Sequence, residues 1–247
     1  MLLCYCGTAF GWGKSGHDAI AYIAECNLTP KAKKNIEKYL DGRSIVYYAS
    51  WMDVYRHTPA YKVTSGWHGD RVDADGKYVP NAKGDALQCI EEAISRLKDY
   101  RSLDDSTVLV SIKYLVHLVG DMHCPVHVKY PWYKNFKFDL NGRPSEFHSF
   151  WDSGGLDLNH RWGYVEYRHQ LDRLTKKEIR AVTAGTPRDW LEESARDCRV
   201  IYEWTKPGQT FNKDEARDLL NTVHPFAEEQ ILKAGYRLAA VLNQLFG

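Results

Sequence analysis

The sequence predicts an all-α fold: a single, mainly helical domain with a small β-hairpin near residues 136–147. Two observations lead to this prediction. Apolar residues recur at helical spacing over several long segments, and one short segment alternates apolar and polar residues before an Asn-Gly pair. The chain has 247 residues, of which 44% are hydrophobic, and this suits a soluble domain with a substantial core.

Helical periodicity extends over most of the chain. The predicted helices cover residues 15–27, 31–40, 84–101, 105–122, 188–204 and 213–246. Residues 105–122 are nearly all apolar, so this helix is expected to be central and buried. The last helix is expected to pack along the domain and close it.

The strand signal is confined to one place. Phe136, Phe138 and Leu140 alternate with polar residues, and Asn141-Gly142 follows directly. Asn-Gly is the strongest short signal for a hairpin turn. A small hairpin is therefore expected to interrupt the helices.

The first eleven residues form a separate segment. Residues 1–11 are apolar and uncharged but too short to span a bilayer, and Ala9 and Gly11 suit cleavage before Trp12. We expect residues 1–11 to be the remnant of a signal peptide, residues 12–247 to form the functional domain, and the protein to be secreted or periplasmic. The alternative is a lipoprotein signal that uses Cys4 or Cys6 and leaves Trp12 internal.

The charge balance excludes some classes of function. The chain has 33 basic and 32 acidic residues, so it lacks the strongly basic surface of duplex-binding proteins. Any phosphate binding must come from a local site. No segment beyond residue 11 approaches membrane-spanning length, and we expect a monomer without stable membrane insertion.

The strongest chemical motif lies at the end of the central predicted helix. His117 and Asp121 are four residues apart and therefore share one helix face. Pro125 is expected to end or distort the helix, so that His127 can turn back toward the same place. These residues alone allow two interpretations: His117 and Asp121 bind one metal ion, or they form a buried His–Asp hydrogen bond within the core.

Further motifs add candidates, although each is weak alone. His148 and Asp152 repeat the four-residue spacing in aromatic surroundings. The others are Ser50-Trp51-Met52-Asp53 with Arg56 one turn later, Trp67-His68, and the step from Trp12 to His17.

Taken together and in this order, the motifs resemble those of the trinuclear zinc nucleases. This family comprises the single-strand nucleases and 3′-nucleotidases of the mung-bean-nuclease type and their bacterial relatives, with the zinc phospholipases C as more distant kin. The likeness covers nearly the whole chain from Trp12, including the last helix at 230–246. It is carried by the motif set and order, and it implies a zinc-dependent phosphodiesterase.

The resemblance implies a ligand set for three zinc ions. The first ion would be held by Asp53, His68, His117 and Asp121. The second would be held by His127, His148 and Asp152. The third would be held by His17, by Asp121 as a bridge, and by the free α-amine and carbonyl oxygen of Trp12. Imidazole and carboxylate ligands suit zinc, and three ions would make the pocket net positive despite its carboxylates.

The implied activity is endonucleolytic cleavage of single-stranded DNA or RNA to 5′-phosphorylated products, with 3′-nucleotidase activity, by attack of zinc-activated hydroxide. Asp53 would orient the water, and Arg56 would stabilise charge on the phosphoryl oxygens. The alternative for Arg56 is an ion-paired helix residue. The alternative functions are a zinc phospholipase C and a catalytically silent zinc-binding protein. The short step from Trp12 to His17 and the identity of Asp152 favour the nuclease.

The chain departs from the family pattern around the expected hairpin. Glu146-Phe147 precedes His148 where the family has Asn-Leu, and Glu146 adds negative charge near the site. The segment 129–138 is also unusual. Its Lys129, Tyr130 and Trp132 are candidates for a platform on which unpaired bases stack, and core packing of the hairpin is the alternative.

The cysteines and the remaining histidines receive no role in the site. Cys26, Cys89, Cys124 and Cys198 can pair in three ways, and the sequence does not choose among them. Without a CxxC pattern a cysteine-ligated metal site is not expected, and Cys124 is interpreted as a buried packing residue. The histidines expected at the surface or behind the ligands are His57, His123, His160, His169 and His224.

Overall fold

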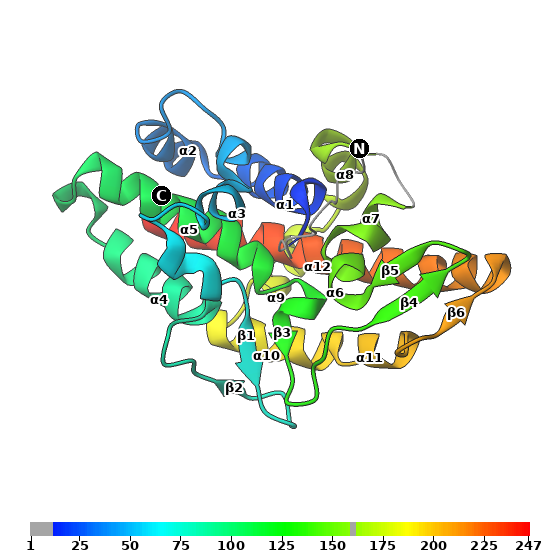
Figure 1. Ribbon diagram of the computed structural model, residues 1–247. Coiled ribbons are helices and arrows are strands. Elements are labelled where there is room, and N and C mark those ends of the chain that lie inside the picture. The colour runs from blue at the N-terminus through cyan, green and yellow to red at the C-terminus, as the bar shows by residue number, and fades with distance from the viewer. Residues whose placement is uncertain (1–11, 159–161) are drawn as a thin grey trace, which may run out of the picture.

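Helices make up most of the chain, as the sequence predicts (Figure 1). The computed structural model describes residues 12–158 and 162–247, so the expectations for residues 1–11 and for His160 lie outside the described residues. The helices are α1 Lys14–Cys26, α2 Pro30–Glu37, α3 Trp51–Tyr55, α4 Ala86–Leu97, α5 Asp105–Asp121, α6 Phe147–Ser149, α7 Gly155–Asp157, α8 Tyr164–Leu171, α9 Lys176–Val182, α10 Pro187–Cys198, α11 Ile201–Trp204 and α12 Lys213–Phe246. The strands are β1 Asp70–Val72, β2 Tyr78–Val79, β3 Val128–Lys129, β4 Lys137–Leu140, β5 Pro144–Glu146 and β6 Thr210–Phe211.

Side-chain caps fix where the long helices begin. Asp85, Asp104 and Asn212 each accept a hydrogen bond from a backbone N–H in the first turn of α4, α5 and α12, respectively. Such a cap satisfies one of the free donors at a helix start and contributes roughly 1 kcal/mol. The polar residue before each apolar run therefore determines the start of the helix.

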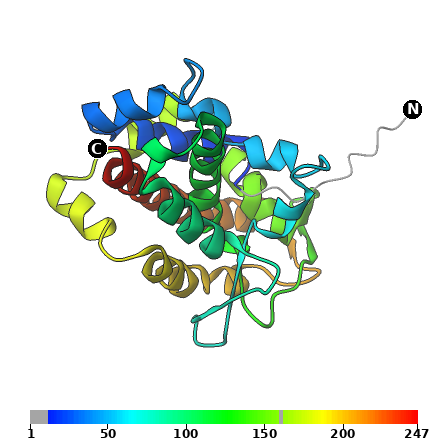
Figure 2. The same cartoon turned by 90° about the vertical axis from the view of Figure 1, so that its left-hand side faces the viewer.

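The core is built where α1 and α5 pack against the long C-terminal helix. Figure 1 shows α12 running across the molecule, and Figure 2 shows its C-terminal end beside the N-terminal helices, which agrees with its contacts to α1 and α2. A Cβ atom at Gly235 would lie 2.6 Å from Ile23 Cγ2, so α12 needs a glycine where it meets α1. The end of α5 that carries His117 and Asp121 is thereby held in the interior.

Several predicted helix boundaries differ in the structure. The predicted helix 188–204 is wrong as a single element, because α10 ends at Cys198 and α11 begins at Ile201. The predicted helix 84–101 ends at Leu97, and a 3₁₀ turn follows at Tyr100–Ser102. The central helix is confirmed, since α5 is buried along most of its second half.

The predicted hairpin is present. Strands β4 and β5 pair antiparallel, with Lys137 opposite Glu146. The turn residues Asn141 and Gly142 both have positive φ, at 56° and 78°, as a tight Asn-Gly turn requires. Strand β6 adds to β4 in parallel, so the described residues form here a three-stranded sheet.

A second small sheet, with strand order β2-β1-β3, was not predicted. Strand β1 pairs parallel with β3, with Asp70 opposite Val128. A Cβ atom at Gly69 would lie 2.8 Å from the backbone oxygen of His127. This close approach brings the chain after His68 against the chain at His127, and it explains the glycine between the two elements.

Two negative findings apply to the described residues. None of their helices is long and apolar enough to cross a membrane. Cys26, Cys89, Cys124 and Cys198 are all free thiols there, so none of the three possible pairings occurs.

Candidate metal centre

The last turns of α5 supply the centre of the site. His117 Nε2 lies 3.2 Å from Asp121 Oδ2, and both side chains are fully buried. His117 Nδ1 lies 2.7 Å from the backbone oxygen of Ala49 and donates to it. That bond fixes the tautomer and leaves Nε2 directed at the carboxylate.

Asp121 is the hub of the cluster. Its Oδ1 lies 3.3 Å from His127 Nδ1 and 3.5 Å from His17 Nε2, and its Oδ2 lies 3.0 Å from His68 Nδ1. These histidines come from α1, from the loop before β1 and from the 3₁₀ turn Pro125–His127. Histidines from three segments besides α5 thus converge on the carboxylate that the family resemblance implies as a bridge.

Asp53 completes one side of the cluster from the short helix α3. Its Oδ1 lies 3.7 Å from His68 Nδ1 and 3.8 Å from His117 Nε2. Arg56, one turn later, is buried and places a guanidinium nitrogen 3.7 Å from the same oxygen. The predicted pair Asp53 and Arg56 therefore lies at the site.

The remaining predicted ligands form a second group. His127 Nε2 lies 3.4 Å from Asp152 Oδ1, and His148 Nε2 lies 3.2 Å from Asp152 Oδ2. His148 is in α6, whereas Asp152 is in a π-helical turn at 150–154, so the four-residue spacing brings them together without a regular α-helix. Tyr133 Oη lies 2.7 Å from His148 Nδ1 and orients the ring.

Trp12 is the first described residue and is fully buried. The N–H of its neighbour Gly13 donates to the backbone oxygen of Asp152, which holds the first described residues against the second group. His17 follows in α1 and stacks on His117 with ring centroids 4.0 Å apart. The role of the Trp12 α-amine stays a prediction, because residue 11 lies outside the described residues.

The pKa values of the cluster are set by burial and by the neighbouring charged side chains. Burial lowers the pKa of His17 and of His68. Burial also opposes charge on His127, but Asp121 and Asp152 more than offset it and raise its pKa to about 10. The pKa of Asp121 is held well below its usual value, since the nearby His117 and His127 outweigh the effect of burial.

The donor set fits metal ions. Several buried polar atoms of the cluster have no hydrogen-bond partner among the described residues, and most buried polar groups in proteins have one. These atoms are both ring nitrogens of His17, Asp53 Oδ1, His68 Nε2, Asp121 Oδ1, His127 Nδ1 and Asp152 Oδ2. Three groups bring one ligand atom from each residue within 4.8 Å of one another: His17, Asp53 and His117; His68, His117 and Asp121; Cys124, His127 and Asp152. Metal ions would satisfy several of these unpaired atoms.

A hollow of 410 Å³ is lined in part by Tyr133, the partner of His148. Of the predicted platform, Lys129 and Tyr130 line it, while Trp132 stacks on Tyr130 and is 41% exposed. Tyr130 itself is buried and donates to a backbone oxygen, so it has a packing role as well. Arg71 also lines the hollow. Sequence reasoning missed Arg71 and Tyr133, and the only signal for Tyr133 is its place in the unusual segment 129–138.

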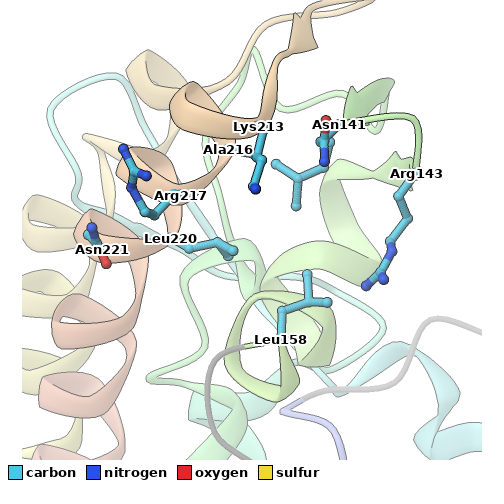
Figure 3. Close-up of a pocket in the computed structure, with 9 residues that line it drawn as sticks. Asn141, Arg143, Leu158, Lys213, Ala216, Arg217, Leu220 and Asn221 are labelled. Carbon is cyan, nitrogen blue, oxygen red and sulfur yellow. The ribbon is translucent and has the colours of Figure 1, made fainter.

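Another hollow, of 320 Å³, contains none of the predicted ligands. It is lined by the hairpin turn, Leu158 and the start of α12. Figure 3 shows Arg143 and Lys213 on opposite sides of this pocket, with Arg217 farther along α12. Its lining is basic but lacks the buried His/Asp chemistry of the cluster.

The other described histidines fall into two kinds. His57 and His169 are exposed, as expected of surface residues. His123 and His224 are buried and do not belong to the metal groups. His123 lies behind the ligands, where Nδ1 donates to the backbone oxygen of Val119 and Nε2 accepts from Arg237.

A mainly helical domain with a buried, three-carboxylate, five-histidine cluster defines a class of candidate metal-dependent hydrolases. Comparison with known proteins narrows the class. The profile of the S1/P1 Nuclease family matches residues 12–247, and the chain belongs to this family of nucleases.

Individual relatives match over nearly their whole lengths. The chain is similar to Nuclease S1 of Aspergillus oryzae, at 25% identity over 95% of this chain and 91% of that protein. It is 26% identical to Nuclease P1 of Penicillium citrinum, over 96% of this chain and 98% of that protein. It is 24% identical to Endonuclease 2 of Arabidopsis thaliana, over 96% and 91%, respectively.

Proposed function

We propose that this chain is a zinc-dependent nuclease that cleaves single-stranded DNA and RNA endonucleolytically to 5′-phosphorylated products and also removes 3′-phosphates from nucleotides. One observation carries the proposal: the buried cluster of imidazoles and carboxylates around Asp121, in a chain of the S1/P1 nuclease family. The family makes the substrate a nucleic acid, and the donor set favours zinc over ions that prefer oxygen ligands alone.

Three ions would divide the ligands as the resemblance implies. Asp53, His68, His117 and Asp121 would hold the first, and His127, His148 and Asp152 the second. His17, Asp121 and the amine of Trp12 would hold the third, provided that the mature chain begins at Trp12. Zinc in such sites lowers the pKa of water to about 7 and neutralises negative charge on a phosphoryl group.

The side chains around the ions would orient the attacking water and balance the negative charge of the phosphoryl group. Asp53 Oδ1 makes no hydrogen bond among the described residues, so it can accept one from the attacking water. Arg56 lies 3.7 Å from that oxygen and would balance the charge of the phosphoryl oxygens with its planar fork. Tyr133 would hold His148 in one orientation through the bond to Nδ1.

Preference for single strands would come from the hollow beside the cluster. Arg71 and Lys129 line it and would bind backbone phosphates, while the exposed ring of Trp132 would stack on a base. A base can stack on a side chain only when it is not paired within a duplex. Glu146, at the end of β5, adds negative charge on the hairpin side and would disfavour long polyanions there.

We further propose that residues 1–11 direct secretion or export to the periplasm, and that the mature enzyme acts as a monomer. Removal of this segment before Trp12 would create the free amine that the third ion requires. Mass spectrometry of the protein recovered outside the cell tests this directly, since the expected mature chain begins at Trp12 and a lipoprotein would begin at Cys4 or Cys6.

A substrate panel tests the proposed activity. Zinc-loaded protein is incubated with single-stranded DNA, single-stranded RNA, duplex DNA, a 3′-mononucleotide and lecithin. We expect cleavage of the single strands, release of phosphate from the 3′-nucleotide and little action on duplex or lipid. Headgroup release from lecithin without strand cleavage would identify a phospholipase C, and zinc binding without any turnover would identify a catalytically silent member.

A further inference from the structure

We propose that the Cys124 thiolate is a fourth protein ligand to the metal ion held by His127, His148 and Asp152. The inference rests on the zinc binding proposed above and adds a sulfur ligand to the carboxylate and imidazole set that the resemblance implies. The sequence alone favours a buried packing residue at this position, because Cys124 has no CxxC partner.

The position of Cys124 places its sulfur inside the second group of ligands. Cys124 follows the end of α5 and precedes Pro125, and its side chain is fully buried. Its Sγ lies 3.7 Å from Asp152 Oδ1. Together with a ring nitrogen of His127, these atoms all lie within 4.8 Å of one another.

The separations match a tetrahedral shell. With Zn–S of about 2.3 Å and Zn–N and Zn–O of about 2.0–2.2 Å, tetrahedral angles place S and O about 3.6 Å apart and N and O about 3.4 Å apart. The observed values are 3.7 Å for Cys124 Sγ to Asp152 Oδ1 and 3.4 Å for His127 Nε2 to that oxygen. These two separations are therefore those expected for ligands of one zinc ion, and His148 approaches the same carboxylate at its other oxygen.

Asp152 supplies an independent sign that a ligand belongs here. The side chain is buried, yet its Oδ2 has no hydrogen-bond partner among the described residues and faces His148 Nε2 at 3.2 Å. Leaving a buried carboxylate oxygen unsatisfied is costly, and an ion would satisfy it. The thiol that faces the other oxygen of this carboxylate is thus directed at the same place.

Sulfur ligation would change the character of this ion. On binding, the thiol loses its proton to solvent, and the thiolate together with Asp152 balances the two positive charges of zinc. Four protein ligands fill the tetrahedral shell that structural zinc sites have, so substrate contact at this ion requires a fifth position. Each of the three ions would then have four protein ligand atoms, and water or substrate would take a fifth position.

Cobalt substitution tests the assignment by a readout other than activity. Co²⁺ is loaded into the full-length protein, into Cys124→Ser and into the control Cys89→Ser, whose buried thiol belongs to none of the metal groups. We expect a near-ultraviolet sulfur-to-cobalt charge-transfer band in the unmodified protein and in Cys89→Ser, and its loss in Cys124→Ser. We also expect Cys124→Ser to bind its weakest zinc ion at least tenfold less tightly.

X-ray absorption at the zinc edge of the unmodified protein keeps the test independent of whether the variant folds. A sulfur neighbour at about 2.3 Å supports the inference, and a shell of nitrogen and oxygen alone overturns it. Zinc binding and strand cleavage without any sulfur signal would refute the cysteine ligand and leave the proposed function intact. Absence of zinc binding altogether would instead refute the proposed function.

Discussion

Replacing Tyr133 by phenylalanine tests whether the residues around the ligands tune metal binding. The change deletes only the hydroxyl that lies 2.7 Å from His148 Nδ1 and keeps the ring that lines the neighbouring hollow. Without this partner the imidazole is free to rotate and is a weaker base. Loss of such a supporting bond to a ligand histidine lowers metal affinity by about 10–100-fold, which corresponds to roughly 1.4–2.7 kcal/mol.

The matched control is Tyr236→Phe. The Tyr236 hydroxyl donates to Asp172 at 2.6 Å, and the Tyr236 side chain is buried whereas Tyr133 is half-buried. Neither partner of this bond belongs to the metal groups found among the described residues. Zinc affinity is measured for both variants by competition with a chelator, and the free energy of unfolding by denaturation of the metal-free protein. Tyr236→Phe should lose about 1.5–3 kcal/mol of stability with unchanged zinc affinity. An unchanged zinc affinity in Tyr133→Phe, or an equal loss in both variants, would refute the reasoning.

Three further predictions concern other parts of the site. Arg56→Lys keeps the positive charge but loses the planar guanidinium, so kcat on single-stranded DNA should fall about 10²–10³-fold with unchanged zinc content. A smaller loss of kcat would support the alternative interpretation of Arg56 as an ion-paired helix residue. Gly69→Ala places a Cβ 2.8 Å from the backbone oxygen of His127 and should lower the free energy of unfolding by about 1–3 kcal/mol, which corresponds to a fall in Tm of about 2–12 °C. In the control Gly66→Ala the added Cβ meets no atom within 4 Å, so Tm should change little. Equal Tm values for the two variants would contradict the close packing at Gly69. Asp121 and Asp152 outweigh the effect of burial and raise the pKa of His127 to about 10, so His127 carries a proton at pH 7 in the metal-free protein. Zinc must displace that proton, and the zinc affinity should therefore rise with pH up to about pH 10. Calorimetry in buffers of different ionisation enthalpy should detect the released proton, and a binding enthalpy that does not depend on the buffer would contradict this prediction.

Much of the cluster follows from spacing that a sequence reveals. His117 and Asp121 share a face of α5 because a helix repeats every 3.6 residues, and the Asn141-Gly142 turn follows from the positive φ that both residues tolerate. The end of helix α5 before Pro125 likewise allows His127 to turn back, so that its Nδ1 lies 3.3 Å from the Asp121 carboxylate.

Other features depend on tertiary contacts that leave no periodic signal. Strands β1 and β3 have three and two residues, too few to show alternation, yet their pairing brings His68 and His127 together. Tyr133 and Cys124 reach the second group of ligands through the folding of irregular segments. The break between α10 and α11 after Cys198 could not be predicted, because the apolar pattern continues through it and periodicity does not resolve so short an interruption.

The central claim is that the cluster around Asp121 holds the zinc ions of a nuclease, and zinc stoichiometry tests it most directly. Zinc is counted by elemental analysis on protein beginning at Trp12, on protein that retains residues 1–11, and on Asp121→Ala in the first background. We predict three ions, two ions and at most one ion, respectively, because the amine completes the third site and Asp121 bridges two. One ion or none in the protein beginning at Trp12, or three ions in Asp121→Ala, would contradict the account.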